Sequence, residues 1–325
     1  MNLDKFEEIL LQHQQHKFLV VDPLGGKGDQ LIYLGMEKKL KELDINYTVL
    51  RYKTARARFH EIKKMLPSLH FLESTTKRLE QITDATYDLI YKKLSKLRAG
   101  FADVVLLRGG AYLNDVWKAY EVLENAIRDN PNCNIIVAPQ SFFFNTTYFP
   151  EFFENTMQEI DLFCRERYSY NLLCSMNFPE NVHIHLSHDT ALYLSKDDFN
   201  SQNGSYDLIC PRGDKESVVD WRIQDLNKQK NMELMTSEHP VDKAIVGDID
   251  LVTDFQAFVN LIENSKIVYT DRLHVAILSA ILGKDTLLYP NIYHKNRGVY
   301  EFSLHKFPNI KFVDSLKFLG QKVPV

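Results

Sequence analysis

Short apolar runs alternate with segments of helical periodicity along most of this sequence. Such alternation is typical of α/β domains, because each crossover between parallel strands needs a connection long enough to form a helix. The pattern therefore predicts an α/β fold with parallel sheets. The predicted strands cover residues 18–21, 47–51, 102–107, 134–138, 162–165, 183–186, 206–210, 266–270 and 286–289.

The connecting segments carry apolar residues at helical spacing. The N-terminal residues 1–18 form an amphipathic, acidic pattern, and residues 77–97 form a basic pattern that suits a solvated helix face. Gly283 follows the helix predicted at residues 273–282, and a glycine often ends a helix in this way. Further helices are predicted after the first strand and at residues 117–127, 151–161 and 255–264.

The length of the chain favours two domains, because 325 residues exceed what one hydrophobic core usually holds. Residues 195–205 are polar and rich in turn-forming residues, which is typical of a linker. The strand–helix alternation then restarts at Tyr206. We predict two Rossmann-like domains, residues 1–195 and 206–303, that face each other across a cleft. The C-terminal segment 304–325 is expected to pack back on the first domain.

The composition excludes several classes of protein. A formal net charge of -4 gives no general attraction to nucleic acid, so no nucleic-acid partner is expected. No apolar run reaches the roughly 18 residues that span a bilayer, and the N-terminus lacks the pattern of a signal peptide. The four cysteines have no regular spacing, which is typical of reduced thiols. These features predict a cytoplasmic protein.

A glycine-rich turn, GGKGD at residues 25–29, follows the first predicted strand. Glycines let backbone N–H groups approach a ligand closely, and a helix N-terminus carries about half a positive charge. Gly25, Gly26 and Gly28 are therefore candidate anion-binding residues. The turn is not a dinucleotide fingerprint, because Leu31 replaces its third glycine. A tight turn without a ligand is the alternative interpretation.

Arginine follows the predicted strands at three points. Arg108 precedes Gly109 and Gly110, while Arg212 and Arg272 follow strands of the second half. The planar guanidinium group can bind a carboxylate or a phosphate through two hydrogen bonds. One such arginine is usually a surface ion-pair partner, but three at equivalent strand ends predict an anion site at the cleft.

The segment TDRLH at residues 270–274 places ionisable side chains between two apolar runs. Thr270 or Asp271 is a suitable N-cap for the helix that follows. Capping does not explain Arg272 and His274, because apolar residues would suit the start of a buried helix better. We therefore predict that Arg272 and His274 lie at the mouth of the cleft and bind an anion or transfer a proton.

Several segments carry motifs that occur together in one known family. They are TDRLH with the apolar residues and LGK after it, GGKGD, LRGG at residues 107–110, APQS at 138–141, RERYS at 165–169, DTA at 189–191 and a closing loop at 291–301. Over about residues 25–301 the chain resembles the polysaccharide pyruvyl transferase family. It departs from the family pattern at Asp29, Thr190 and Val275, where asparagine, proline and glycine are frequent.

The resemblance implies the two-Rossmann-domain, GT-B-like glycosyltransferase fold. It also implies an enzyme that moves the enolpyruvyl group of phosphoenolpyruvate onto a sugar, closes it to a cyclic ketal and releases phosphate. The donor would lie mainly on the second domain, and the acceptor on the first. Expected donor residues are Arg212, Arg272, Lys295, Arg297, Gly25, Gly26 and Gly28, and expected acceptor residues are Arg108, Gly109, Gly110, Gln140 and Ser141.

Ketal formation needs an acid for the methylene carbon and a base for the sugar hydroxyl. Histidine has an unperturbed pKa of about 6.5 and suits this work at neutral pH, so His274 is the predicted acid/base. Asp29 is the second catalytic candidate, holding or activating the hydroxyl. No cofactor is implied besides phosphoenolpyruvate as donor substrate. The expected acceptor is a sugar, an oligosaccharide or a lipid-linked glycan, with peripheral association with membrane assembly machinery.

Other interpretations stay open at the level of sequence. A nucleotide-sugar glycosyltransferase would use Glu301 or Glu263 for the donor ribose, and a binding protein in polysaccharide assembly would have no activity. His183 and His185 share a strand face and, with His188, could chelate a metal, although the resemblance requires none. The aromatic residues at 142–149 could stack on a sugar or pack in a core.

Overall fold

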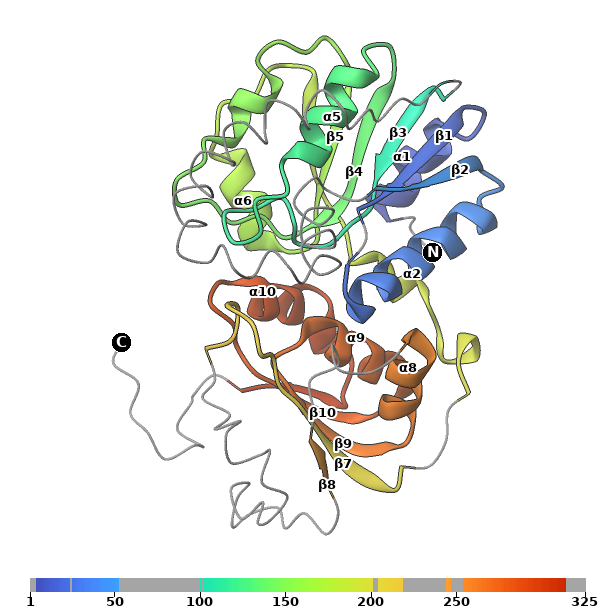
Figure 1. Ribbon diagram of the computed structural model, residues 1–325, viewed down its shortest axis with the longest axis vertical. Helices are drawn as coiled ribbons and strands as arrows, with labels where there is room; N and C mark the ends of the chain where they lie inside the picture. Colours follow the sequence, from blue (N-terminus) through green and yellow to red (C-terminus); the bar gives the residue numbers. More distant parts are fainter. Residues whose placement is uncertain are drawn as a thin grey trace, which may run out of the picture.

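The computed structural model describes residues 4–23, 25–52, 100, 102–200, 204–218, 244–246 and 254–313. Two parallel sheets form two halves that lie one above the other in Figure 1. Each of the predicted strands lies within two residues of a strand in the structure, which confirms the α/β prediction. The predicted basic helix at 77–97 lies outside the described residues.

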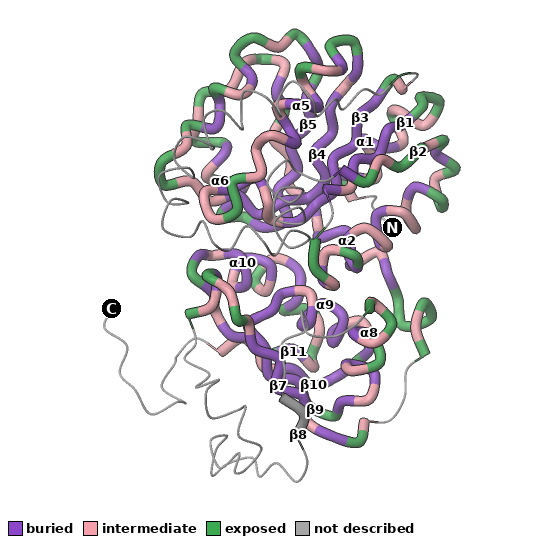
Figure 2. Tube along the Cα trace, viewed as in Figure 1, coloured by how far each residue is buried: buried purple, intermediate pink, exposed green. Residues whose placement is uncertain are grey.

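The first sheet has six parallel strands in the order β2-β1-β3-β4-β5-β6. Its central strands are buried on both faces, as expected for a sheet covered by helices. Figure 2 shows this burial as purple segments along the strands. The strands are β1 (Lys17–Asp22), β2 (Asn46–Arg51), β3 (Val104–Leu107), β4 (Asn134–Gln140), β5 (Ile160–Cys164) and β6 (Val182–Leu186).

The helices of this half correct two predictions. The helix predicted at 117–127 begins only at Glu121, because Asn114 and the residues after it form a turn. The segment 151–161 contains only the end of a short 3₁₀ helix before β5 begins. The helical elements are α1 (Lys5–Gln12), α2 (Lys27–Glu42), α5 (Glu121–Asp129), η2 (Phe149–Phe153), α6 (Arg167–Cys174), η3 (Thr190–Tyr193) and η4 (Lys196–Asp198).

The second sheet has the order β11-β10-β9-β7-β8, again with parallel pairs. Gly283 ends α9, as predicted, and has φ 71°, in the left-handed conformation that glycine adopts easily. The elements are β7 (Tyr206–Cys210), β8 (Ala244–Val246), α8 (Phe255–Glu263), β9 (Ser265–Thr270), α9 (Leu273–Leu282), β10 (Asp285–Leu288), α10 (Lys295–Phe302), η6 (Leu304–Lys306) and β11 (Ile310–Phe312).

The C-terminal segment differs from the prediction as far as it is described. Strand β11 pairs with β10, so residues 304–313 extend the second sheet and do not pack back on the first half. The apolar side chain of Ile310 is buried in the core of the second half, which explains this placement. Residues 314–325 lie outside the described part of the chain.

Helix α2 belongs to the first half in sequence but packs on the second half as well. Its Leu31 is fully buried in the same apolar cluster as residues of α8 and α9. In Figure 1, α2 accordingly lies between the upper sheet and α9. Leu31, which replaces the third glycine of a dinucleotide fingerprint, therefore joins the two halves.

Two glycines on the same face of α2 allow this close packing. A Cβ atom on Gly35 would lie 1.9 Å from the carbonyl oxygen of Thr190 in η3. A Cβ atom on Gly28, two turns earlier, would lie 2.8 Å from His274 in α9. The helix can therefore approach both neighbours only because these side chains are absent.

We expect Gly35→Ala to destabilise the protein. The added methyl group meets backbone that cannot move aside locally, and overpacking of this kind costs roughly 1–3 kcal/mol. Gln30→Ala, an exposed position on the same helix, is the control and should change stability by less than about 0.5 kcal/mol. Urea unfolding followed by circular dichroism measures both. Equal stability of Gly35→Ala and the parent would contradict the tight contact.

Candidate functional site

A pocket of about 400 Å³ lies between the two halves. Its walls come from segments that follow β1, β3, β5, β7 and β9, the edge at which ligands bind in open parallel sheets. The pocket brings together most of the predicted site residues. They are Gly25, Gly26, Gly28, Asp29, Arg108, Arg212, Arg272, His274 and Lys295.

Other predicted residues lie outside the pocket lining in the part of the chain that the structure describes. Gln140 and Ser141 are fully buried behind it, and Gln140 donates a hydrogen bond to the carbonyl of Arg108. Gly110 has φ 140°, a backbone conformation that favours glycine, so its role is to allow this turn of the chain. Arg297 is on the surface, 3.7 Å from Glu301. Gly109 packs against the carbonyl of Pro139.

Asp29 occupies the N-terminus of α2. Its Oδ2 accepts a hydrogen bond of 2.9 Å from the backbone N–H of Gly26, the N-cap residue. A Cβ on Gly25 would overlap this carboxylate, which explains the glycine. Part of the positive end of the helix is therefore already matched by a side chain of the helix itself. Asp29 lines the pocket, where it caps the helix and its Oδ1 lies 3.6 Å from Arg108 Nη1.

The TDRLH segment is arranged differently from the prediction. Helix α9 begins at Leu273 with Arg272 at the N-cap position, and no side chain caps it. Thr270 instead joins β9 to β7 by donating a hydrogen bond to Cys210 O. Asp271 accepts hydrogen bonds from the backbone N–H of Arg212 and the hydroxyl of Ser217. Asp271 thus holds the loop after β7 against the pocket.

His274 contacts a buried ion pair from the first half. Its Nε2 lies 3.4 Å from Asp189 Oδ2 and 3.5 Å from an Nη atom of Arg165. Arg165 and Asp189 are themselves 2.8 Å apart and almost fully buried. Neither was predicted as a site residue, although both lie in segments, RERYS and DTA, that carry the family resemblance.

The environment of Asp189 keeps its carboxyl group ionised. Burial alone would raise its pKa, but the hydrogen bond to His274 and the charge of Arg165 outweigh burial. The pKa of Asp189 therefore lies well below its ordinary value. The carboxylate of Asp189 and the guanidinium of Arg165 both lie beside Nε2, so together they fix the orientation of the His274 ring.

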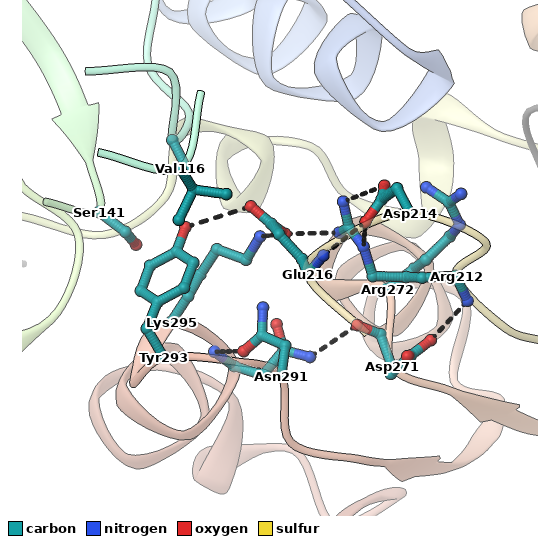
Figure 3. A network of polar contacts seen from close by, with 12 residues as sticks. Val116, Ser141, Arg212, Asp214, Glu216, Asp271, Arg272, Asn291, Tyr293 and Lys295 are labelled. Atoms are coloured by element: carbon teal, nitrogen blue, oxygen red, sulfur yellow. Dashed lines mark hydrogen bonds and ion pairs between the residues drawn. The ribbon is translucent and has the colours of Figure 1, made fainter. Parts of the chain in front are cut away.

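A second network surrounds the buried carboxylate of Glu216 (Figure 3). Its Oε2 lies 3.0 Å from Arg212 Nη1 and contacts Lys295 Nζ, while its Oε1 accepts a hydrogen bond from the indole N–H of Trp117. Arg212 also forms a bidentate pair with Asp214. The predicted donor residues Arg212 and Lys295 are therefore held in place by carboxylates that sequence analysis missed.

Burial and the neighbouring charges lower the pKa values of both Lys295 and Glu216. Burial lowers the pKa of Lys295 to about 8; Glu216 opposes this shift, and Arg212 and Arg165 add to it. Burial would raise the pKa of Glu216, but the charges of Lys295 and Arg212 hold it at about 2. Glu216 is thus ionised at neutral pH, whereas Lys295 can lose its proton in mildly alkaline solution.

The described residues contain no group of three or more side chains suited to hold a metal ion. His183 and His185 instead pair with Glu159 and Asp161, at 2.8 and 2.7 Å. Most of the aromatic residues at 142–149 pack into the core of the first half, so the core interpretation is the better one. No helix within the described ranges is both long and apolar enough to cross a membrane.

The fold and the pocket define a GT-B-like α/β protein with a cation-rich pocket between two parallel sheets. The sequence matches the family described as polysaccharide pyruvyl transferase over residues 27–291, which is most of the chain. The chain belongs to this family and is a transferase.

The chain is also similar to individual proteins. A Bacillus subtilis (strain 168) protein named "Putative pyruvyl transferase EpsO" is 23% identical over 235 residues, covering 65% of this chain and 72% of that protein. A functionally uncharacterized protein of Klebsiella pneumoniae has the same fold, with a TM-score of 0.60 and 22% identity over 96% of this chain and 98% of that one. A UDP-GlcNAc 2-epimerase of Methanocaldococcus jannaschii matches with a TM-score of 0.47, 14% identity and coverage of 93% and 90%.

We expect Asp189→Asn to lower stability by roughly 3–5 kcal/mol, because it leaves the buried guanidinium of Arg165 without a counter-charge. Since folding lowers the pKa of Asp189, the stability that its carboxylate contributes is present above the unfolded pKa and is lost as pH falls through the folded pKa. The variant should therefore lose less stability than the parent between neutral and acidic pH. Urea unfolding at several pH values measures both effects.

Glu159→Gln is the matched control, because it also removes a carboxylate that pairs with a histidine. That pair is exposed, so the change should cost less than about 1 kcal/mol. A similar loss in the two variants would show that the burial of Asp189 does not matter.

Proposed function

We propose that this protein transfers the enolpyruvyl group of phosphoenolpyruvate to a sugar of a polysaccharide, or of its lipid-linked precursor, and closes it to a pyruvate ketal. The observation that carries this proposal is the convergence of Arg165, Arg272 and Lys295 with His274 in one pocket. Phosphoenolpyruvate carries a phosphate and a carboxylate close together, so its site requires several cations at short range.

The donor would bind to these cations. Arginine forks suit the carboxylate and the phosphate oxygens, and Lys295 adds a compact charge. Arg212 is already paired with Asp214 and Glu216, so we assign it the role of shaping the site rather than that of a lone clamp. Asp29 similarly pairs with Gly26 and Arg108, so we assign it the role of holding the start of α2 rather than that of a phosphate ligand.

The reaction is balanced without a cofactor. One sugar hydroxyl attacks C2 of the donor while C3 takes up a proton and becomes a methyl group. The bond between C2 and the phosphate oxygen then breaks, and the second hydroxyl attacks C2. Of the two hydroxyl protons released, one replaces the proton given to C3 and the other leaves with phosphate.

His274 is the proposed acid/base in this sequence. Asp189 orients its ring through Nε2, and His274 lines the pocket beside Arg272 and Lys295. A histidine held in this way can give a proton to C3 and recover one from a sugar hydroxyl. The acceptor would enter from the first half, and the protein would act in the cytoplasm, in contact with membrane-bound assembly machinery.

A nucleotide-sugar glycosyltransferase has less support. Glu301 pairs with Arg297 and Tyr168 on the surface, and Glu263 is buried in α8. Neither residue is in the lining of the pocket described above. Phosphate release from phosphoenolpyruvate, compared with turnover of nucleotide sugars, tests the two functions directly.

We expect the affinity for phosphoenolpyruvate to fall as pH rises through about 8, because Lys295 loses its charge there. Above this pKa the dissociation constant should rise by up to about tenfold per pH unit. Glu216→Gln should move the loss to lower pH, since the carboxylate raises the pKa of Lys295. Lys295→Arg should abolish the loss. Calorimetric titration from pH 6.5 to about 10 measures the dissociation constant of phosphoenolpyruvate in each variant. A pH profile of Lys295→Arg equal to that of the parent would contradict the role of Lys295 in donor binding.

We expect His274→Gln to lower turnover by roughly 10²–10⁴-fold, the usual contribution of one positioned acid or base. Glutamine keeps hydrogen bonding but cannot titrate. Binding of phosphoenolpyruvate should change far less than turnover. Phosphate release and calorimetry separate the two quantities, and parental turnover of a folded variant would reduce the histidine to a binding residue.

A further inference from the structure

An exposed tryptophan lies at the edge of the pocket and has no part in the chemistry described so far. Trp117 is 40% exposed, yet it lines the same pocket as Arg272 and His274. It belongs to the loop between β3 and α5, on the first half of the protein. A large aromatic side chain left partly in water at a pocket edge is a common means of binding a ligand with an apolar face.

The backbone that carries this tryptophan is fixed by a buried residue. The side-chain oxygen of Asn114 accepts hydrogen bonds of 3.0 and 2.9 Å from the N–H groups of Val116 and Trp117. Asn114 also contacts the hydroxyl of Tyr293 from the second half. Lys118, the next residue, has φ 54°, which closes the turn. The loop is therefore formed before any ligand binds.

The indole ring itself is held at its edge and on one face. Its N–H donates a hydrogen bond of 2.6 Å to Glu216, and the ammonium of Lys215 lies 4.7 Å from the ring centroid. Lys215 in turn contacts the carbonyl of Val116. One face of the ring is thus covered by a cation, and the ring is oriented without being buried. Because the ring is already oriented, stacking of a ligand on it costs little conformational entropy of the protein.

The ring borders the donor cations directly. The carboxylate that accepts its N–H also contacts Arg212 and Lys295 through the other oxygen. One carboxyl group therefore separates the indole edge from Lys295, a cation proposed to bind phosphoenolpyruvate, and from Arg212, which shapes the same site. A sugar ring packed on the indole would have its hydroxyls beside the donor.

We propose that Trp117 forms the acceptor subsite and stacks on the pyranose ring of the sugar that receives pyruvate. The proposal rests on the proposed function, because it assigns the acceptor side of the same site. The C–H groups on one face of a pyranose carry small positive charges and pack well on the negative face of an indole ring. Lys215 binds one face of the ring, and the sugar binds the ring on its exposed part.

The test uses the fluorescence of this ring. The chain has two tryptophans, so Trp221→Phe leaves the emission of Trp117 alone. Methyl pyranosides of glucose, galactose, mannose and N-acetylglucosamine are titrated with saturating inorganic phosphate in place of the donor. At least one glycoside should change the emission saturably. A lack of response to every glycoside overturns the proposal.

Two substitutions then separate stacking from the hydrogen bond. In saturation-transfer NMR, Trp117→Leu should weaken binding of the responding glycoside by about tenfold or more, while Trp117→Phe, which keeps a ring but no N–H, should weaken it by less than about threefold. Equal losses in the two variants would overturn the proposal, because the contact with Glu216 would then be what matters.

Tyr148→Leu is the matched control, since Tyr148 is an aromatic residue of the same half, 47% exposed and away from the pocket. It should bind the glycoside like the parent, and an equal loss there would also overturn the proposal. Binding of phosphoenolpyruvate is measured separately by calorimetry. Its absence would refute the proposed function without affecting the fluorescence result.

Discussion

The two halves of the protein meet at a buried ion pair of the first half, which a histidine of the second half contacts. Arg165 has almost no contact with water, so its charge must be matched within the protein. Asp189 provides the match from the first half, and His274 of the second half completes the group. Since His274 reaches this ion pair only when the second half is docked in this way, the contact favours one relative arrangement of the sheets. The pocket depends on that arrangement, because each sheet supplies part of its wall.

Much of this architecture could be predicted from the sequence. The central strands of the first sheet are short, apolar and buried on both faces, so their positions stand out from the amphipathic helices between them. Parallel strands place their carboxyl ends at one edge, and polar residues at those ends, such as Arg212 and His274, were therefore expected to meet. The site could be located because sheet geometry converts a repeated position in the sequence into proximity in space.

The remaining features depend on contacts between residues far apart in the chain. Glu216 had no special neighbours in the sequence, and its importance comes from Lys295 and Trp117, which approach it from other segments. Trp117 was assigned to a helix because it continues an apolar pattern, whereas the side chain of Asn114 forms a turn there. Asp271 was expected to cap a helix, but two hydrogen bonds to the loop after β7 determine its position.

The contact face of α2 also limits how this protein can change in evolution. Every coded amino acid except glycine carries a Cβ atom, so no single-codon change at Gly28 or Gly35 avoids a collision with His274 or Thr190. Substitutions at these two positions are therefore unfavourable, whichever sugar the protein uses as acceptor. The side chain of Trp117 is partly exposed, so it can be replaced without such a collision while Asn114 holds the backbone of its loop. With Trp117 in its proposed acceptor role, substitutions in that loop are the route to new sugar specificity, while the helix that joins the halves stays the same.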